Sequence, residues 1–447
     1  MAPVIIPNVA FNHVMQDPFG IDVIVNNETY AAPNRFFAHW TMMKYFRTAP
    51  LFLQNFISPL NSVYAACAIA KTVMQLMMIL ILSSFISGTY RILRKDFLVA
   101  AVIITPMLQI AGYYETMGII TRSITYSFFY ALPIMFLLLF FLPFYLKFSK
   151  QKPIVFNSIL KIVLLLLIIF LSFNGPLIPG VILIACPLIL FQKFRFHFRN
   201  QNENSHFKKV RLSLKKIPVQ LVFNLSAFSL LCLYSLYIGT YNSENFEVTV
   251  PVTERYLKLL SGLYSYLTDR LGIPLLMLSV LINFFILKKF GDKVQAGKIL
   301  IMMKWIYFFI VAYLLLLPLG GFRIYRSNIL RFDTAIPITI CLIFLFGIST
   351  FFLLNNLSGK LRAPFLIYTS LLLLNFTLVD NSLVWGNYFE REAITQIANS
   401  KKDIVEVAGN TPVMSWENIT DYKNSEMNSE LLQIWNVTKE KKLYHQK

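Results

Sequence analysis

Long runs of apolar residues, separated by short polar links, make up most of the chain between residues 63 and 380. An α-helix rises ~1.5 Å per residue, so about 20 apolar residues cross the roughly 30 Å hydrocarbon core of a membrane. The runs contain 16 to 25 residues each. We therefore predict an all-α polytopic membrane protein with about ten transmembrane helices, at residues 63–87, 97–114, 124–146, 154–173, 177–192, 217–239, 272–288, 299–319, 335–354 and 363–380.

Four of the predicted helices contain an internal proline. A proline lacks a backbone donor and clashes with the preceding turn, so it kinks or breaks the helix that contains it. We expect such kinks or breaks at Pro106, Pro133, Pro187 and Pro337.

Lysine and arginine are distributed unevenly between alternate links. Twenty lie in the links at 88–96, 147–153, 193–216, 288–298 and 355–362, and seven in those at 115–123, 174–176, 240–271 and 320–334. Cytoplasmic links carry the excess of basic residues, so both termini of this chain are predicted to be extracytoplasmic. Residues 1–62 would then lie outside with no crossing before them. Either this segment is translocated unaided or one further helix precedes Met1; we favour the second.

The predicted crossings divide the chain into an extracytoplasmic N-terminal region at 1–62, a transmembrane domain at 63–380 and a small extracytoplasmic C-terminal region at 381–447. The N-terminal region is aromatic and weakly polar, so we expect interfacial helices in it, with one at 36–58, and another in the link at 240–271. We expect the C-terminal region to form an ordered cap, because Trp416 and Trp435 would otherwise be exposed to water.

The composition excludes a soluble domain. Hydrophobic residues make up 56% of the chain and charged residues 14%, against roughly 25% charged residues in globular domains. The net charge of +19 does not indicate a nucleic-acid partner, because the basic residues lie mainly in links that orient a membrane protein. The densest basic run, from Lys193 to Lys216, is expected to contact anionic headgroups. Membrane lipids are therefore predicted partners, and nucleic acid is not.

The sequence contains no signature of a metal or nucleotide site. The four cysteines lie within apolar runs, where cysteine acts as a small hydrophobic residue, and the five histidines have no ligand spacing. The P-loop, GxGxxG and GxSxG motifs are absent in the contexts that give them meaning. We therefore expect no cofactor and no metal centre, and a divalent metal has no support in the sequence.

The link GGFRIYRSNILRFDT, at 320–334, places Arg323, Arg326 and Arg331 on the predicted outer side, against the prevailing charge bias. Arginine presents a planar fork of donors that matches phosphate oxygens. One interpretation is that the three arginines bind a lipid-linked phosphate or pyrophosphate. The other is that they reach outer-leaflet headgroups, or pair with Asp333 and neighbouring carboxylates. The sequence leaves both open.

Candidates for a general base are carboxylates on the predicted outer side. They are Asp17 and Asp22 in QDPFGID, Glu28 in the same region, and Glu115 in GYYETMG. Asp17 and Asp22 also suit a turn or a helix cap, which is the commoner role of such residues. Lys71 interrupts the first apolar run near its outer end. It is a candidate for neutralising a substrate phosphate, or for pairing with a carboxylate.

The long outer first region, the ten or eleven crossings and the basic outer link resemble the GT-C superfamily of membrane glycosyltransferases. The segments FNGPLIPGV (173–181) and PLGGFRIYRSNILRFDTAIP (318–337) resemble uncharacterised Bacteroidetes membrane proteins of that type. The resemblance covers most of the chain in topology but rests on no strict motif. The usual acidic pair of the superfamily, close after its first helix, has no counterpart here.

The resemblance implies a bacterial cytoplasmic (inner) membrane enzyme that takes a sugar from a polyprenyl-phosphate donor on the extracytoplasmic face, in cell-envelope glycan assembly. Asp17, Asp22 or Glu115 would act as the base, and Arg323, Arg326, Arg331 and Lys71 would hold phosphate. Two alternatives from other classes stay open: a transporter, flippase or polymerase of lipid-linked saccharides, and a non-catalytic assembly subunit.

Overall fold

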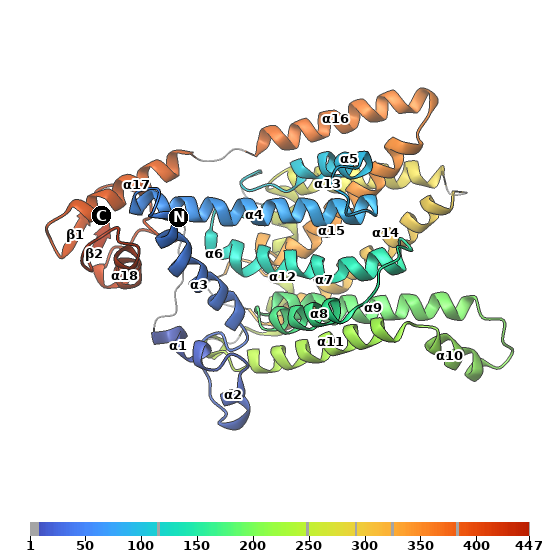
Figure 1. The fold of residues 1–447 in the computed structure, drawn as a ribbon, viewed down its shortest axis with the longest axis horizontal. Helices are drawn as coiled ribbons and strands as arrows, with labels where there is room; N and C mark the ends of the chain where they lie inside the picture. Colours follow the sequence, from blue (N-terminus) through green and yellow to red (C-terminus); the bar gives the residue numbers. More distant parts are fainter. Residues whose placement is uncertain are drawn as a thin grey trace.

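The computed structural model describes residues 9–113, 117–246, 250–290, 293–322, 326–380 and 384–446. Regular structure in these residues is nearly all helical, with one two-stranded sheet. The long helices run roughly along one axis, and the first and last elements, α1 and β2, lie at the same end of that axis (Figure 1). These long helices are α4 (Pro59–Ser87), α7 (Leu132–Phe148), α9 (Leu177–Arg199), α11 (Val219–Gly239), α14 (Val294–Leu316), α15 (Phe332–Asn356) and α16 (Arg362–Val379).

Seven helical stretches in the described part of the chain are long and apolar enough to cross a membrane, or eight if one bent pair of helices counts as a span. The chain is therefore a multi-pass membrane protein. The predicted number of about ten crossings is not confirmed, because three predicted segments form shorter helices: α5 (Lys95–Ile104), α8 (Ser158–Ser172) and α13 (Gly272–Lys288). The seven stretches are Pro59–Ser87, Ile124–Phe148, Leu177–Arg199, Val219–Gly239, Val294–Gly320, Phe332–Asn356 and Gly359–Val379.

The predicted helix at 97–114 is shorter than expected, and the reason is Pro106. Helix α5 ends at Ile104 and passes into the 3-10 turn η1 (Thr105–Met107), after which residues 108–113 and 117–123 are irregular. Much of this irregular backbone is buried, so its polar groups need partners from other segments. Helix α4 supplies two of them, because Lys71 donates to the carbonyl of Arg122 and Gln75 to that of Leu108.

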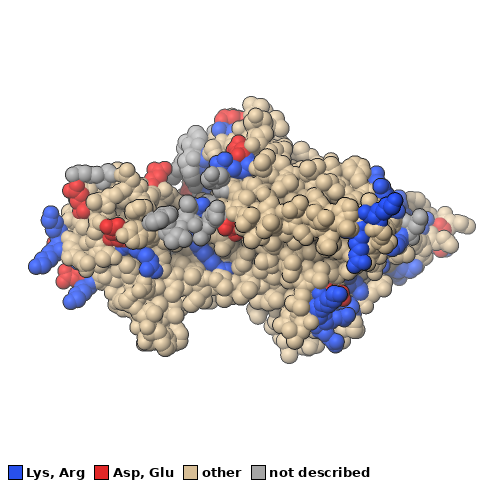
Figure 2. Space-filling model, turned by 90° about the horizontal axis from the view of Figure 1, so that it is seen from above, with Lys and Arg blue, Asp and Glu red and all other residues tan. Residues whose placement is uncertain are grey.

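Helix α15 lies at the centre of the membrane domain. Of its apolar stretch 83% is buried, compared with 22% in each of α14 and α16, which present apolar side chains outward. A broad area without Lys, Arg, Asp or Glu separates the charged side chains at the two ends of the long axis, and the end away from the termini is mainly basic (Figure 2). This is the surface that a lipid-embedded bundle presents. Further elements of the domain are α6 (Ile124–Tyr126), the π-helical turn η2 (Ser127–Ala131), α10 (His206–Lys215), η3 (Ser243–Asn245), η4 (Leu317–Gly320) and η5 (Gly359–Leu361).

Helix α12 (Val252–Thr268) precedes α13, and the two are bent by 79° relative to each other. The segment that was predicted as an interfacial helix at 240–271 is therefore largely helical. Tyr256 on α12 donates to the carbonyl of Leu315, and Tyr266 bonds to Thr339 of α15 at 2.7 Å. Helix α12 thus packs across the ends of α14 and α15.

Three helices form the N-terminal region: α1 (Val9–Gln16), α2 (Ile21–Val25) and α3 (Phe36–Leu53). Helix α3 contains His39, Lys44 and Arg47 and is not among the stretches apolar enough to span a membrane. It packs against α4 through Tyr45, whose hydroxyl donates to the carbonyl of Ala66 at 2.8 Å.

The C-terminal region is an ordered cap built from α17 (Val384–Asn399), β1 (Ile404–Val407), η6 (Tyr422–Ser425), α18 (Glu426–Ile434) and β2 (Leu443–Gln446). Strands β1 and β2 pair in parallel. Trp435 is fully buried and donates to the carbonyl of Phe46 on α3 at 2.8 Å. Glu390 of α17 accepts from Tyr64 of α4 at 2.9 Å. The cap therefore packs on the end of the bundle that carries the N-terminal region (Figure 1).

Candidate functional site

An arginine centre lies where α15 begins. Arg331 donates to Asp333 through Nη2 at 2.7 Å and through Nε at 3.2 Å, and Arg326 Nη1 is 4.0 Å from the same carboxylate. The Asp333 side chain is only 3% exposed, whereas those of Arg326 and Arg331 are 23% and 20% exposed. Pairing with Asp333, one of the two interpretations of the sequence, is therefore present. Both guanidinium groups face this carboxylate at the start of α15.

The start of α15 explains why Asp333 is buried there. The Thr334 hydroxyl accepts from the backbone of Arg331 at 2.9 Å, and Asp333 accepts from the backbone of Thr334 at 3.0 Å. A carboxylate in the first turn of a helix is stabilised by free backbone N–H groups and by the helix dipole. The helix terminus and two arginines thus share this one anion.

Aromatic side chains border the arginine centre. The ring of Tyr126 on α6 lies 5.3 Å from that of Phe332 and 4.9 Å from that of Trp416 in the cap. Trp416 is 51% exposed, so the expectation that the cap buries both Trp416 and Trp435 is wrong for Trp416. Tyr126 precedes the π-helical turn η2, a form of backbone that is common at functional sites.

Lys71, another predicted phosphate contact, bonds to backbone of a neighbouring segment. Its Nζ donates to the carbonyl of Arg122, in the irregular segment before α6. Gln75, one turn later on α4, makes the same kind of bond to Leu108. Lys71 therefore donates a hydrogen bond to backbone of the segment before α6. Its predicted contact with phosphate stays a prediction.

Asp17 holds the turn between α1 and α2. Its two carboxylate oxygens accept from the backbone N–H groups of Ile21 at 2.8 Å and Asp22 at 2.9 Å, and from the Tyr30 hydroxyl at 2.8 Å. The turn needs Gly20, whose φ of +69° suits glycine and whose Cα packs against Ile238. Asp17 is 5% exposed. Both oxygens of this buried carboxylate are occupied by donors, so the geometry fits a cap.

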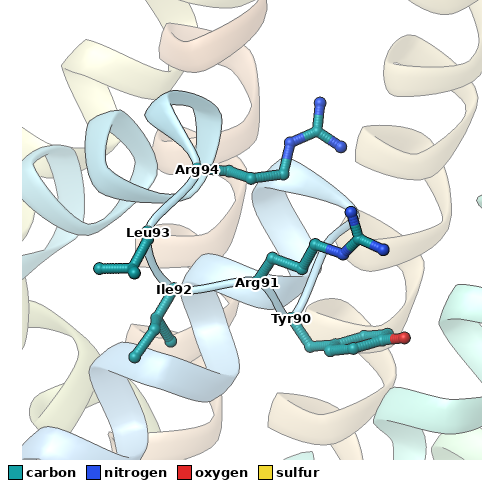
Figure 3. A pocket seen from close by; sticks show the side chains of 5 residues that line it. All are labelled: Tyr90, Arg91, Ile92, Leu93 and Arg94. Carbon is teal, nitrogen blue, oxygen red and sulfur yellow. The ribbon is translucent and has the colours of Figure 1, made fainter.

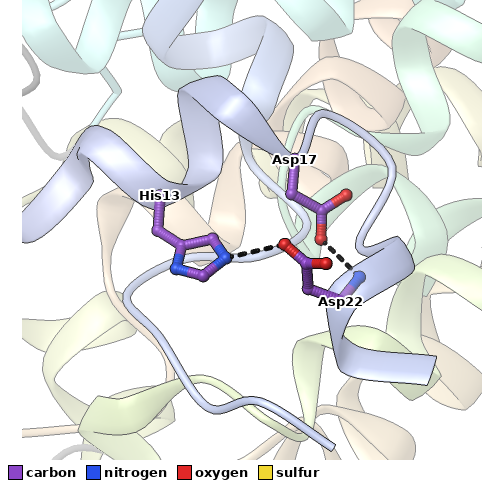
Figure 4. Close-up of side chains that lie close together, drawn as sticks. All are labelled: His13, Asp17 and Asp22. Carbon is purple, nitrogen blue, oxygen red and sulfur yellow. Dashed lines mark hydrogen bonds and ion pairs between the residues drawn. The ribbon is translucent and has the colours of Figure 1, made fainter. Parts of the chain in front are cut away.

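A second group of ionisable side chains lies on the same turn (Figure 4). His13 Nε2 is 3.0 Å from Asp22 Oδ2 and 3.2 Å from Glu28 Oε2. The ring of His13 stacks on that of Tyr30, with centroids 4.1 Å apart and planes 8° apart. Burial, followed by the hydrogen bond to Asp17, raises the pKa of Tyr30 well above its usual value. Tyr30 is therefore a neutral donor to Asp17 at physiological pH.

The two groups are held by different elements. The acidic turn packs on the end of α11, where Tyr234 donates to the carbonyl of Phe19 and Asn242 accepts from the backbone of Ala32. The arginine centre packs on α6 and the cap. Arg35, which precedes α3, lies 5.8 Å from the ring of Phe129 on η2. The predicted site residues Arg323 and Glu115 lie outside the described residues.

A shallow open pocket of about 460 Å³ lies in the link after α4, where Tyr90, Arg91, Ile92, Leu93 and Arg94 line it. Arg91 and Arg94 extend side by side, and Ile92 and Leu93 point the other way (Figure 3). Leu93 is 88% exposed. One turn of chain forms the whole pocket, so it offers no convergent groups for a reaction.

No protein-family profile, curated protein or solved structure matches this chain. The site must therefore be argued from its geometry. Sequence patterns did not single out His13 or Tyr126, and they marked Trp416 only as a residue that the cap would bury, because each acquires its neighbours only through folding. The only early signal for His13 was its proximity in sequence to Asp17 and Asp22.

Proposed function

We propose that this protein is a glycosyltransferase that takes a sugar from a polyprenyl-phosphate donor, at the end of the bundle that carries the N-terminal region and the cap. The observation that supports this proposal is the arginine centre, in which Arg326 and Arg331 face the single carboxylate of Asp333. Two guanidinium groups next to a helix N-terminus favour an incoming phosphate.

The surroundings of the arginine centre suit such a donor. A lipid-linked phosphate must enter from the membrane while its hydrocarbon tail stays in the bilayer, and the arginine centre lies at the end of the membrane domain. Tyr126 and the half-exposed Trp416 offer aromatic faces beside the charge. Aromatic faces carry partial negative charge and pack well against the C–H groups of a sugar ring.

The proposed transfer needs a base and a stabilised leaving group. A carboxylate removes the proton of the acceptor hydroxyl, whose oxygen bonds to the anomeric carbon as the bond from that carbon to the phosphate oxygen breaks. The phosphate leaves with the bonding electrons, and the arginines stabilise its added charge. Among the candidate bases, Asp17 has its oxygens occupied, whereas the Asp22 side chain is 40% exposed.

We also propose the finer topology that the sequence suggests. The protein would lie in a bacterial cytoplasmic membrane, with about ten crossings and with the termini of this chain outside. The basic loop at Tyr90–Arg94 would then meet lipid headgroups on the cytoplasmic side, with Leu93 in contact with lipid.

Binding of the donor tests the proposal. We would measure the affinity of the purified full-length protein for a short-chain polyprenyl-phosphate glucose, and for polyprenyl phosphate and inorganic phosphate as separate arms. Loss of one charged contact costs roughly 1.5–3 kcal/mol, or about ten- to hundred-fold in affinity. We expect this ten- to hundred-fold loss of affinity for the donor in Arg326→Ala and in Arg331→Ala. In the inorganic phosphate arm, we expect little binding.

Arg362→Ala is the matched control, because Arg362 is exposed at the start of α16, at the other end of the bundle. Arg326→Ala is the decisive variant, since Arg326 contacts Asp333 only at 4.0 Å and its loss leaves the Arg331 pair intact. Unchanged affinity in Arg326→Ala and Arg331→Ala would reject the phosphate role.

A further inference from the structure

The turn that joins α1, α2 and the following loop brings a histidine and two carboxylates to one point. His13 Nε2 faces Asp22 Oδ2 at 3.0 Å and Glu28 Oε2 at 3.2 Å. A ring nitrogen carries at most one hydrogen, so it cannot make a full hydrogen bond to both oxygens. A metal ion in place of that hydrogen can bind the nitrogen and both carboxylates at once.

We propose that His13, Asp22 and Glu28 bind a divalent transition-metal ion, such as Mn²⁺ or Zn²⁺. Imidazole nitrogen and carboxylate oxygens bind such ions at about 2.0–2.2 Å. Two ligands at that distance, 90–109° apart, are separated by about 2.8–3.6 Å. The separations of 3.0 and 3.2 Å fall in that range.

The residues around these three side chains hold them in position. Tyr30 stacks on the His13 ring and donates to Asp17, which in turn binds the backbone of Asp22. Asp17 also has a carboxylate oxygen within 4.8 Å of ligand atoms of His13 and Asp22, but its oxygens already have three donors. Asp17 is therefore a positioning residue, of the kind that orients metal ligands from behind.

The site is open to further ligands. The side chains of His13, Asp22 and Glu28 are 33%, 40% and 44% exposed, so water or a substrate oxygen can complete the coordination. The site goes beyond the proposed transfer reaction and does not depend on it. It makes Asp22 a ligand in place of the free base considered above.

Binding of Mn²⁺ to the chelator-treated, full-length protein in detergent tests the site. Electron paramagnetic resonance measures the free ion, whose signal falls as the protein binds it. We expect one equivalent to bind, and at least a ten-fold loss of affinity in His13→Gln and in Glu28→Gln. Zn²⁺ should displace Mn²⁺ at lower concentration, in the order of their usual affinities.

Glu254→Gln is the matched control, because Glu254 is an exposed carboxylate of α12 near Lys258. Glu28 lies in an exposed loop, so its variant should fold even if His13→Gln does not. Two outcomes would overturn the proposal: equally weak Mn²⁺ binding in wild type and Glu28→Gln, or a loss of affinity in Glu254→Gln as large as that in Glu28→Gln. Either would mean that Mn²⁺ binds only loosely to surface carboxylates. Mn²⁺ binding is independent of phosphate binding at the arginine centre, so the experiment can support this site even if the phosphate role is rejected.

Discussion

The Arg331 guanidinium donates two hydrogen bonds, of 2.7 and 3.2 Å, to Asp333 at the first turn of α15, the most buried of the membrane-spanning stretches. Two parallel bonds of this kind require the planar fork of arginine, which lysine cannot reproduce. The pair therefore has a structural task in addition to any role in binding phosphate.

This pair predicts a difference between two substitutions. Arg331→Ala leaves a carboxylate that is 3% exposed with weaker partners, and breaking such a pair costs on the order of 3 kcal/mol. Arg331→Lys keeps the charge and should cost less. Thermal unfolding in detergent measures both. Equal stability of wild type and Arg331→Ala would show that Arg326 and the helix terminus suffice for Asp333.

Lys71 offers a second test, because its structural contact and its predicted contact with phosphate have different consequences. Lys71→Met leaves the buried carbonyl of Arg122 without this donor, which should cost about 1–3 kcal/mol. Hydrogen exchange should rise in residues 117–123, and affinity for the polyprenyl-phosphate sugar should stay within about two-fold. A hundred-fold loss of that affinity at unchanged stability would assign Lys71 to the phosphate instead.

Trp416 and Trp435 of the cap should differ in their effect on its attachment. Trp435 is fully buried and bonds to Phe46, so Trp435→Ala should cost about 3–5 kcal/mol and expose the cap to protease. Trp435→Phe keeps most of the contact and should cost about 1 kcal/mol for the lost hydrogen bond. Trp416→Ala, at a half-exposed position, should leave the cap resistant. Limited proteolysis of the folded protein distinguishes these outcomes, and a cap that is cleaved rapidly in wild type would contradict the docking.

His39 should make the stability of the protein sensitive to acid. Burial in α3, and then the charge of Arg35, lower the pKa of His39 to about 3, below the ordinary value of about 6.5 that applies to the unfolded chain. Between these values the unfolded state binds a proton that the folded state excludes, so stability falls as the pH falls from about 6.5 towards 3. The slope approaches about 1.4 kcal/mol per pH unit.

Melting temperatures measured from pH 7 to pH 4.5 test this claim. His39→Gln should flatten the dependence, whereas His206→Gln, at an exposed position on α10, should keep that of the wild type. An identical pH dependence of the melting temperature in His39→Gln and wild type would show that His39 does not cause it.

The orientation in the membrane can be tested with single cysteines. Ser205 precedes α10 in the basic link and Asn245 lies in η3; both are exposed, whereas Asn242 is buried against Ala32. With an impermeant maleimide, we expect labelling of Asn245→Cys but not Ser205→Cys in intact cells, and labelling of both after lysis. Native Cys67, Cys186 and Cys232 are buried and should contribute little. Labelling of Ser205→Cys alone would invert the topology.

The sequence by itself determined that the chain is helical and lies in a membrane. All ten predicted segments contain helix, because a long apolar run in a bilayer must satisfy its backbone hydrogen bonds within itself. That requirement is local, and it can be recognised from hydrophobicity alone. The link at 320–334 could also be recognised from the sequence, since its three arginines run against the prevailing charge bias.

Only the tertiary structure decided where the helices break and which polar groups meet. Residues 108–113 and 117–123, after Pro106, are irregular, and Lys71 and Gln75 on another helix pair with carbonyls of this backbone. Trp435 finds its acceptor in Phe46, 389 residues away in the chain. His13 meets Asp22 and Glu28 because Asp17 and Gly20 turn the backbone between two short helices. Such partners come from packing between segments that are distant in the chain, or from the geometry of a single turn, and neither follows from a hydrophobic pattern.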